Sequence, residues 1–349
     1  MLNKERSTRN KTIDFTVKQL EKELIRVKNI DSDIEKLDNV INSTINGDTF
    51  KILEKLPKNS IDLCIIDPPY NISKKFNELN FSRMKDDSYV EYTRKWINLI
   101  YPLLKETATI YVCCDWKTSM IIAPILAEKF YIQNRITWER EKGRGSKNNY
   151  KNSMEDIYFL TKSKNFYFNV DSIMHRKKVI APYKENGKPK DWNQTEIGNF
   201  RNTYPSNIWT DISIPYWSMP ENTAHPTQKP EKLIAKLVLA SSKENDVVLD
   251  PFLGSGTTSV VAKKLNRKYI GIELDQQFCA WAEYRLEKAD HDKTIQGYAD
   301  GVFWPRNSLS VIKNLKNSAL YKIHFNFKIF ILLFFVTFSA IQKSYNMIH

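Results

Sequence analysis

The sequence predicts an α/β fold in which a doubly wound, mostly parallel sheet is covered by helices on both faces. Short apolar runs rich in β-branched and aromatic residues alternate with segments of helical periodicity from about residue 44 to residue 290. Such runs are typical of strands that are buried on both faces. From about 163 to 220 the alternation stops, and a stretch rich in Asn, Pro, Lys and aromatic residues predicts an inserted, mostly irregular module.

Residues 14–41 come first along the chain and place apolar side chains three and four positions apart among nearly balanced charges. This spacing predicts one amphipathic helix, which docks on the main domain or pairs with another chain. The expected strands are 61–66, 107–114, 156–161, 246–250 and 268–273. The expected helices are 89–104, 117–130, 230–242, 257–265 and 275–289.

Positive charge is concentrated in part of the chain. The formal net charge is +13, and residues 135–190 hold 14 Lys and Arg against 6 Asp and Glu. A basic excess within one internal stretch favours a surface for a polyanion, with nucleic acid as the first candidate, because phosphate contacts supply most sequence-independent affinity. A solvated basic face would give the same pattern.

Cysteines and histidines give no sign of a disulfide or metal framework. Cys64, Cys113, Cys114 and Cys279 form no CxxC pair, which predicts reduced, buried thiols in a cytoplasmic protein. The five histidines lack ligand spacing, so no metal site is expected. The N-terminus shows no signal peptide, and the apolar run 329–341 is shorter than the roughly 18 to 20 residues that span a bilayer, so no membrane anchor is expected.

The stretch DVVLDPFLGSGTTSVVAKKL, residues 246–265, joins a buried strand to a helix through a glycine-rich turn. Gly254 and Gly256 allow the backbone to approach a ligand closely. A GxxxxGK[ST] phosphate loop would need a lysine that is absent, and Ser259 makes a GxGxxG match partial. Glu273 ends the next strand, where its carboxylate can accept hydrogen bonds from ribose hydroxyls. A ligand that contains ribose is therefore favoured.

Asp250 restricts the ligand further. A carboxylate directly before the glycine turn repels a pyrophosphate and attracts an ammonium or sulfonium group. S-adenosylmethionine (AdoMet), an adenosine joined to an amino acid, suits both Asp250 and Glu273. The alternative is a purely structural strand-to-helix corner.

The stretch IDLCIIDPPYN, residues 61–71, ends a strand with an acid, two prolines and an aromatic ring. The Asp67 carboxylate and the Pro68 carbonyl can each accept one N–H of an exocyclic amino group, which draws the nitrogen toward tetrahedral geometry and stabilises the charge that develops there. Pro68 and Pro69 have no competing N–H and hold the backbone rigidly. Tyr70 offers a face for base stacking.

An amino group inside a duplex cannot reach such a pocket, so the base must flip out at a cost of a few kcal/mol. Trp138 either lines the pocket for the flipped base or belongs to the core. The basic stretch would grip the DNA, and its expected contacts are Lys142, Arg144, Lys147, Arg176, Lys177 and Lys178.

DPPY at 67–70 and DPFLGSG at 250–256, in this order and about 180 residues apart, resemble the catalytic and cofactor motifs of the β group of amino-group DNA methyltransferases. HPTQKP at 225–230 resembles that group's further cofactor motif. The resemblance covers about 45–290. It implies a Rossmann-like domain that binds AdoMet through Asp250, Pro251, Phe252, Gly254, Ser255, Gly256, Thr257, Thr258, Glu273, His225 and Lys229.

The resemblance also implies a division of the chain. Residues 44–162 would form the catalytic half, 163–220 the target recognition insertion and 221–295 the AdoMet-binding half. Outside it lie an amphipathic extension, 1–43, and a basic and apolar tail of unassigned role, 296–349. If this tail is dispensable, a chain that ends near residue 300 stays soluble and active; inactivity would place the apolar run in the core.

An Asp at the head of the PPY motif favours adenine N6 over cytosine N4 as the target in double-stranded DNA. Cytosine-N4 methylation and a DNA-binding protein without catalysis are the alternatives. A restriction-modification setting would add a cognate restriction endonuclease as a partner, and the oligomeric state is open, a homodimer included. The recognition sequence cannot be read from an irregular insertion.

Overall fold

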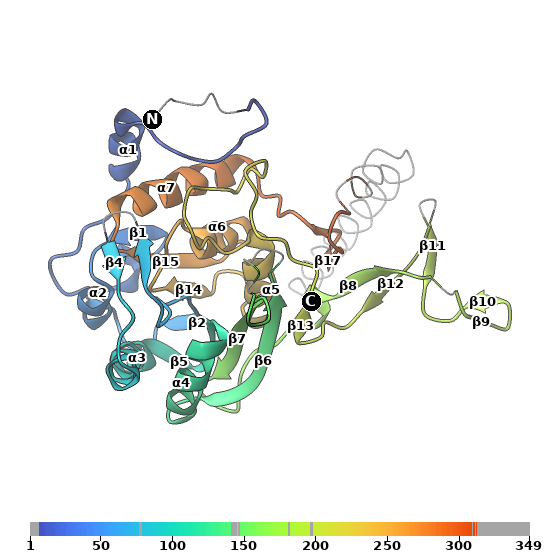
Figure 1. Ribbon diagram of the computed structural model, residues 1–349, viewed down its shortest axis with the longest axis horizontal. Helices are drawn as coiled ribbons and strands as arrows, with labels where there is room; N and C mark the ends of the chain where they lie inside the picture. The colour runs from blue at the N-terminus through green and yellow to red at the C-terminus, as the bar shows by residue number, and fades with distance from the viewer. Residues whose placement is uncertain are drawn as a thin grey trace, which may run out of the picture.

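The computed structural model describes residues 7–76, 79–140, 145, 147–180, 182–195, 198–308, 310 and 312. Its centre is an eight-stranded sheet in which only β7 runs antiparallel to its neighbours, β5 and β6 (Figure 1). The order is β1 (Ser43–Asn46), β15 (Lys268–Glu273), β14 (Val247–Asp250), β2 (Ile61–Ile66), β5 (Leu104–Cys114), β7 (Met154–Thr161), β6 (Tyr131–Glu139) and β13 (Ile208–Trp209).

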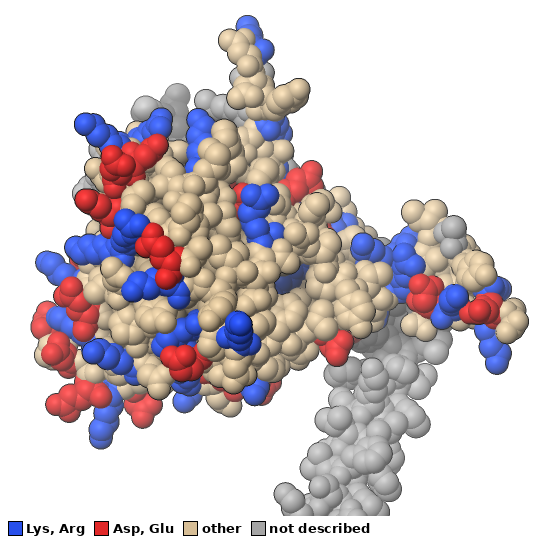
Figure 2. All heavy atoms as spheres, turned by 90° about the horizontal axis from the view of Figure 1, so that it is seen from below, with Lys and Arg blue, Asp and Glu red and all other residues tan. Residues whose placement is uncertain are grey.

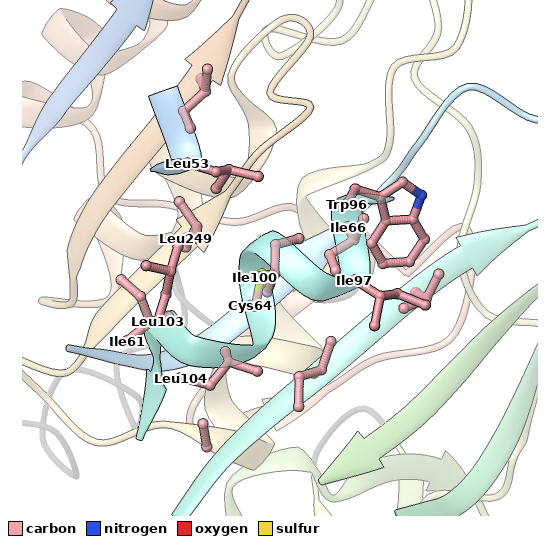
Figure 3. Close-up of a cluster of buried hydrophobic side chains, with 14 of the residues drawn as sticks. Leu53, Ile61, Cys64, Ile66, Trp96, Ile97, Ile100, Leu103, Leu104 and Leu249 are labelled. Atoms are coloured by element: carbon pink, nitrogen blue, oxygen red, sulfur yellow. The ribbon is translucent and has the colours of Figure 1, made fainter. Parts of the chain in front are cut away.

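Helices cover both faces of this sheet, so the predicted doubly wound α/β fold is confirmed. One layer holds α2 (Thr49–Lys55), α3 (Asp86–Ile100) and α4 (Trp116–Ala127), and the other holds α5 (Glu231–Ser241), α6 (Thr257–Lys264) and α7 (Gln276–His291). Alternate strand residues enter the two layers, as a period of two requires: Cys64 packs in the cluster with Leu53 and Ile97 (Figure 3), whereas Leu63 packs with Leu233.

All ten expected strands and helices are present, with shifted ends. The expected helix 89–104 starts at Asp86 and ends at Ile100, because Pro102 follows in a short 3-10 turn (Tyr101–Leu103). Strand β1 is short and partly polar, and α2 spans two helical turns, so neither carries a clear periodic signal. Strand β6 is also an addition to the expected elements. All four cysteines are free and buried, as predicted.

The N-terminal prediction of one helix over 14–41 is wrong. Helix α1 (Val17–Leu24) starts at a Thr16 capping box and is only eight residues long. The chain then runs extended beside β1, where the Lys28 N–H donates to the Thr44 carbonyl at 2.9 Å. Beyond this contact the chain is irregular with one 3-10 turn (Leu37–Asn39). Ile34 enters the core and Leu37 and Ile41 pack against it, so their helix-like spacing reflects burial against the sheet edge. Helix α1 itself docks on α7, the first of the two expected outcomes.

Most residues of the insertion 163–220 lie outside helices and strands, as expected, but the region also contributes strands that the sequence did not predict. The region projects to the right in Figure 1 as a second, five-stranded sheet with a small hairpin beyond it. The sheet order is β11 (Asn193–Thr195), β12 (Gly198–Thr203), β8 (His175–Lys178), β17 (Val302–Phe303) and β16 (Tyr298–Ala299), and the hairpin is β9 (Lys184–Glu185) with β10 (Lys188–Pro189). A further hairpin, β3 (Lys74–Phe76) with β4 (Leu79–Phe81), follows the DPPY stretch. Short, polar strands such as β8, with the sequence HRKK, have no alternating apolar pattern, so they could not be predicted from the sequence.

The first part of the expected tail, 296–349, belongs to the fold. Phe303 of β17 pairs with His175 of β8. Trp304 is 2% exposed, and Lys232 of α5 donates to its carbonyl. A chain ending near residue 300 would lose these contacts, so the expectation that such a chain stays active conflicts with the structure. The apolar run 329–341 lies outside the described residues; within them, no helix is long and apolar enough to cross a membrane.

Candidate active site

The carboxyl ends of β2, β14 and β15 open onto one cavity of about 490 Å³. This is the sheet edge where ligands of open α/β folds bind. The two motifs, far apart in sequence, meet here. The predicted site residues that line the cavity are Asp67, Pro68, Pro69, Tyr70, His225, Lys229, Asp250, Phe252, Gly254, Ser255, Thr257, Thr258 and Glu273. Pro251 and Gly256 are not in the lining; the Pro251 carbonyl accepts a hydrogen bond from the Thr49 hydroxyl.

Gly254 brings the loop against both His225 and Glu273. Its φ is +57°, and an added Cβ would lie 3.1 Å from Nε2 of His225. The Gly254 N–H donates to Oε2 of Glu273 at 2.8 Å, and the Asp275 N–H donates to Oε1 at the same distance. Asp275 then caps helix α7. Glu273 therefore fixes the glycine turn relative to the start of α7.

Gly256 and Arg285 hold the loop from its buried side. Gly256 has φ +87°, and an added Cβ would lie 2.5 Å from that of Ala282 on α7. Arg285, 3% exposed, donates to the Ser255 carbonyl at 2.7 Å and to the Thr257 hydroxyl at 3.0 Å. Close packing of this kind leaves room only for glycine at 256.

Two acids face the cavity beside the glycine turn. Burial raises the pKa of Asp250 to about 7, although its carboxylate accepts the Phe252 N–H at 3.0 Å. Burial likewise raises the pKa of Glu273 to about 7. Among the described residues, no Lys or Arg forms an ion pair with either acid. A ligand that brings an ammonium group and hydroxyls would supply the missing partners, so these residues fit AdoMet.

The acid of the DPPY stretch is held on both oxygens. The Tyr70 hydroxyl donates to Oδ1 of Asp67 at 2.8 Å, and the Lys229 ammonium donates to Oδ2 at 2.5 Å. The same ammonium lies 3.2 Å from the Tyr70 hydroxyl and 3.4 Å from Oε2 of Glu155. Lys229, which the resemblance assigns to the cofactor, thus contacts the group assigned to catalysis.

Glu155 and Arg140 complete this end of the cavity, and neither was predicted from the sequence. Glu155 is the second residue of strand β7, is 4% exposed and pairs with Arg140, which directly follows β6. Two adjacent acids opening an apolar strand, Glu155 and Asp156, were the available signal, because a buried acid needs a partner. Asp48, Asn152 and Phe278 also line the cavity.

Tyr70 and Lys229 keep their protonation states at neutral pH. Burial, and then the negative charges of Asp67 and Glu155, raise the pKa of Tyr70 well above its usual value, so it remains a hydroxyl that donates. Burial alone would lower the pKa of Lys229, but the same two acids raise it above its ordinary value. Lys229 is therefore an ammonium.

The predicted base-pocket and DNA residues lie in several places. Trp138 is 1% exposed and donates to the Ile212 carbonyl at 3.0 Å, so it belongs to the core and is not among the residues that line the cavity. Lys142 and Arg144 lie outside the described residues. Lys147, Lys177 and Lys178 are exposed, whereas the Arg176 guanidinium donates to Asn202 and lies 5.2 Å from the Trp304 ring centre. Figure 2 shows basic side chains on the main body and on the projecting end, interspersed with acidic ones.

A family model for N6 and N4 DNA methylases matches residues 61–284. The chain belongs to this family. It is 37% identical over 250 residues to the type II methyltransferase M.HpaI of Haemophilus parainfluenzae, covering 70% of this chain and 73% of the relative. It is 34% identical over 260 residues to the DNA adenine methyltransferase YhdJ of Escherichia coli K12, covering 72% and 85%.

Among solved structures, the PvuII cytosine-N4-specific DNA methyltransferase matches with a TM-score of 0.53 and 17% identity, covering 71% of this chain and 90% of that one. This match shows the same fold. The family resemblance, the fold class and AdoMet as cofactor are thereby confirmed, and this DNA methyltransferase acts on an amino group of a base in DNA.

Proposed function

We propose that this DNA methyltransferase transfers a methyl group from AdoMet to N6 of an adenine flipped out of double-stranded DNA, at a specific sequence. One observation carries the proposal: Asp67 and Gly254, more than 180 residues apart in the chain, line the same cavity. The acceptor for the target amine and the loop for the cofactor therefore face a common space.

Asp67 and the Pro68 carbonyl accept the two N–H groups of the target amine in this proposal. Tyr70 and Lys229 fix the carboxylate while a second lone pair on each oxygen stays available. Such preorganised acceptors stabilise the positive charge that develops on the amine nitrogen during transfer. Tyr70 lines the cavity, where its ring can stack with the flipped base.

Asp250, Glu273 and the glycine turn would hold AdoMet, together with His225, Phe252 and Thr258 from the lining. Bound AdoMet supplies an electrophilic methyl group on a sulfonium. Hydrogen bonds from the ribose hydroxyls would offset the cost of burying Glu273, and Asp250 would attract the cationic part of AdoMet. Gly256 and Arg285 keep the turn in place.

Adenine is favoured over cytosine by the Asp at the head of the motif and by the likeness to a DNA adenine methyltransferase over 72% of this chain. Cytosine N4 is the alternative on the same scaffold. Relatives described as type II methyltransferases support a role in restriction-modification, with a cognate endonuclease as a partner in the cytoplasm.

We assign target recognition to 163–220 together with strands β16 and β17, since they complete one sheet. Exposed Lys147, Lys177 and Lys178 would contact phosphates, which would position the duplex without reading its sequence.

The test is methyl transfer from labelled AdoMet to genomic DNA, followed by digestion to nucleosides and mass measurement. The proposal predicts labelled N6-methyladenine. Labelled N4-methylcytosine would select the alternative base, and protein that binds AdoMet and DNA yet transfers no label would show a DNA-binding protein without catalysis.

A further inference from the structure

Lys229 bridges the two ends of the cavity through its side chain and its backbone. Its ammonium contacts Asp67 at 2.5 Å and Glu155 at 3.4 Å. Its carbonyl accepts a hydrogen bond from the Thr257 hydroxyl at 3.0 Å. The side chain is only 8% exposed, so these contacts are made away from bulk water.

The ammonium closes a ring of hydrogen bonds around the Asp67 carboxylate. Lys229 holds Oδ2, Tyr70 holds Oδ1, and Lys229 also lies 3.2 Å from the Tyr70 hydroxyl. Because both oxygens are held, the carboxylate cannot rotate freely. The remaining lone pairs then keep a fixed direction.

The charges of this cluster balance only when Lys229 is present. Asp67 and Glu155 bring two negative charges, and Arg140 pairs with the far oxygen of Glu155. Without the ammonium, two neighbouring carboxylates would share one cation. A buried charge that loses its partner is strongly destabilised.

The backbone of Lys229 is tied to the cofactor loop by a buried network. Arg285 donates to the Thr257 hydroxyl at 3.0 Å, and Thr257 in turn donates to the Lys229 carbonyl. Arg285 also pairs at 3.1 Å with Glu231, two residues after Lys229. A shift of the glycine turn would therefore move the start of α5 and the base of the Lys229 side chain.

We propose that Lys229 is a positioning residue for methyl transfer, which orients and charge-balances Asp67 and links that carboxylate to the cofactor loop through Thr257. The inference rests on the proposed function of this cavity. It differs from a cofactor contact, because the ammonium is engaged by two acids and a hydroxyl. A lysine that bound the cofactor would offer its ammonium to the AdoMet carboxylate, whereas this ammonium is already paired with Asp67 and Glu155.

The titratable and charged groups around this ammonium come from every adjoining element. They are Asp67 and Tyr70 after β2, Cys113 of β5, Arg140 after β6, Glu155 of β7 and Asp250 of β14. With Lys229 gone, one of the neighbouring carboxylates binds a proton more readily. The acidic limb of kcat against pH then moves to higher pH.

The test compares Lys229→Met with Lys229→Arg in the full-length protein, using labelled methyl transfer to DNA and AdoMet binding by calorimetry. Lys229→Met should lower kcat by about 100-fold, the effect of a misplaced catalytic group, with an AdoMet Kd within about threefold of wild type. Its acidic limb should move upward. Lys229→Arg keeps the charge, so its acidic limb should stay in place while kcat falls because the guanidinium has a different shape.

Lys236→Met is the matched control. Lys236 lies in α5, is 1% exposed and pairs with the Asp211 carboxylate, but it does not line the cavity. This variant should lower stability without moving the acidic limb. If Lys229→Met raises the AdoMet Kd as much as it lowers kcat, Lys229 is a cofactor contact and the inference is wrong.

Should Lys229→Met fail to fold, Lys229→Arg is the variant that tests the inference. A raised AdoMet Kd with unchanged kcat in Lys229→Arg contradicts it. Wild-type protein that transfers no methyl group overturns the proposed function and, with it, this inference. Active wild type with an unaffected Lys229→Met overturns the inference alone.

Discussion

The two ends of the cavity treat their buried acids differently. At the glycine-loop end, Asp250 and Glu273 have raised pKa values and, among the described residues, no Lys or Arg in an ion pair. At the DPPY end, Asp67 and Glu155 each have a cation, Lys229 and Arg140. The acids at the glycine-loop end thus depend on a ligand for a positive charge, whereas those at the DPPY end already have one from the protein.

This difference matches the tasks proposed for the two ends. A cofactor that binds and dissociates binds best where buried acids of the protein have no cationic partner, because the cofactor then offsets the cost of desolvating these acids. A group that polarises a substrate works best when its orientation is fixed before the substrate arrives. Changes at the two ends should therefore affect different measurements.

The largest effect is expected from Asp67→Ala. Both the acceptor for the target amine and the partner of Lys229 are lost, so kcat for methyl transfer should fall by at least about 1,000-fold. Labelled transfer to DNA measures this. Asp67→Asn is the matched variant, since it keeps the shape but brings an NH₂ donor toward the amine, and activity near wild type in either variant would rule out the assigned role.

A smaller effect, on folding, is expected from Gly256→Ala. The added methyl would lie 2.5 Å from the Ala282 side chain at a positive φ, so the free energy of unfolding should drop by about 2 to 4 kcal/mol. Chemical denaturation measures it. Adding Ala282→Gly should recover part of the loss, and a double variant no more stable than the single one would show that the contact with α7 is unimportant.

The smallest effect is the pH dependence of cofactor affinity. With pKa values of about 7 for Asp250 and Glu273, each carboxyl is only about one-tenth ionised at pH 6. The AdoMet Kd should fall about five- to tenfold from pH 6 to pH 7.5. Calorimetry at both pH values measures it, and Asp250→Asn should flatten the dependence. A Kd that is flat in wild type would mean that Asp250 does not meet the cation.

The same raised pKa values set the sign of a stability effect in the ligand-free protein. The ordinary values are 3.8 and 4.5, so between about pH 4 and 7 the folded state binds more protons than the unfolded state. The contribution of these acids to the free energy of unfolding therefore decreases as pH rises through that window.

The sequence predicted what depends on local backbone chemistry. DPPY and the glycine turn are rigid or permissive by composition, and both follow buried strands, so their meeting at one sheet edge could be predicted. Glu155 could not be placed, because its position opposite Lys229 depends on the antiparallel strand β7. The role of Lys229 was missed for a similar reason, since its carbonyl and ammonium contact elements far away in the chain.

The misjudged segments share another cause. Ile34, Leu37 and Ile41 are spaced as on a helix, but they belong to an irregular stretch with one 3-10 turn that packs against the core. The second sheet is built from strands of two to six residues. Strands β8, β11 and β12 carry mostly polar side chains, and β16 and β17 come from beyond residue 297. Periodicity reports burial on a regular element, so it misleads where burial comes from irregular chain or is slight.

The most direct measurement of the division between the two ends is the AdoMet Kd of Asp67→Ala, determined by calorimetry on protein whose fold is verified. The account predicts a Kd within about threefold of wild type, since the glycine loop and its two acids are untouched. A loss of cofactor affinity as large as the loss of methyl transfer would contradict it and would make Asp67 part of the cofactor site.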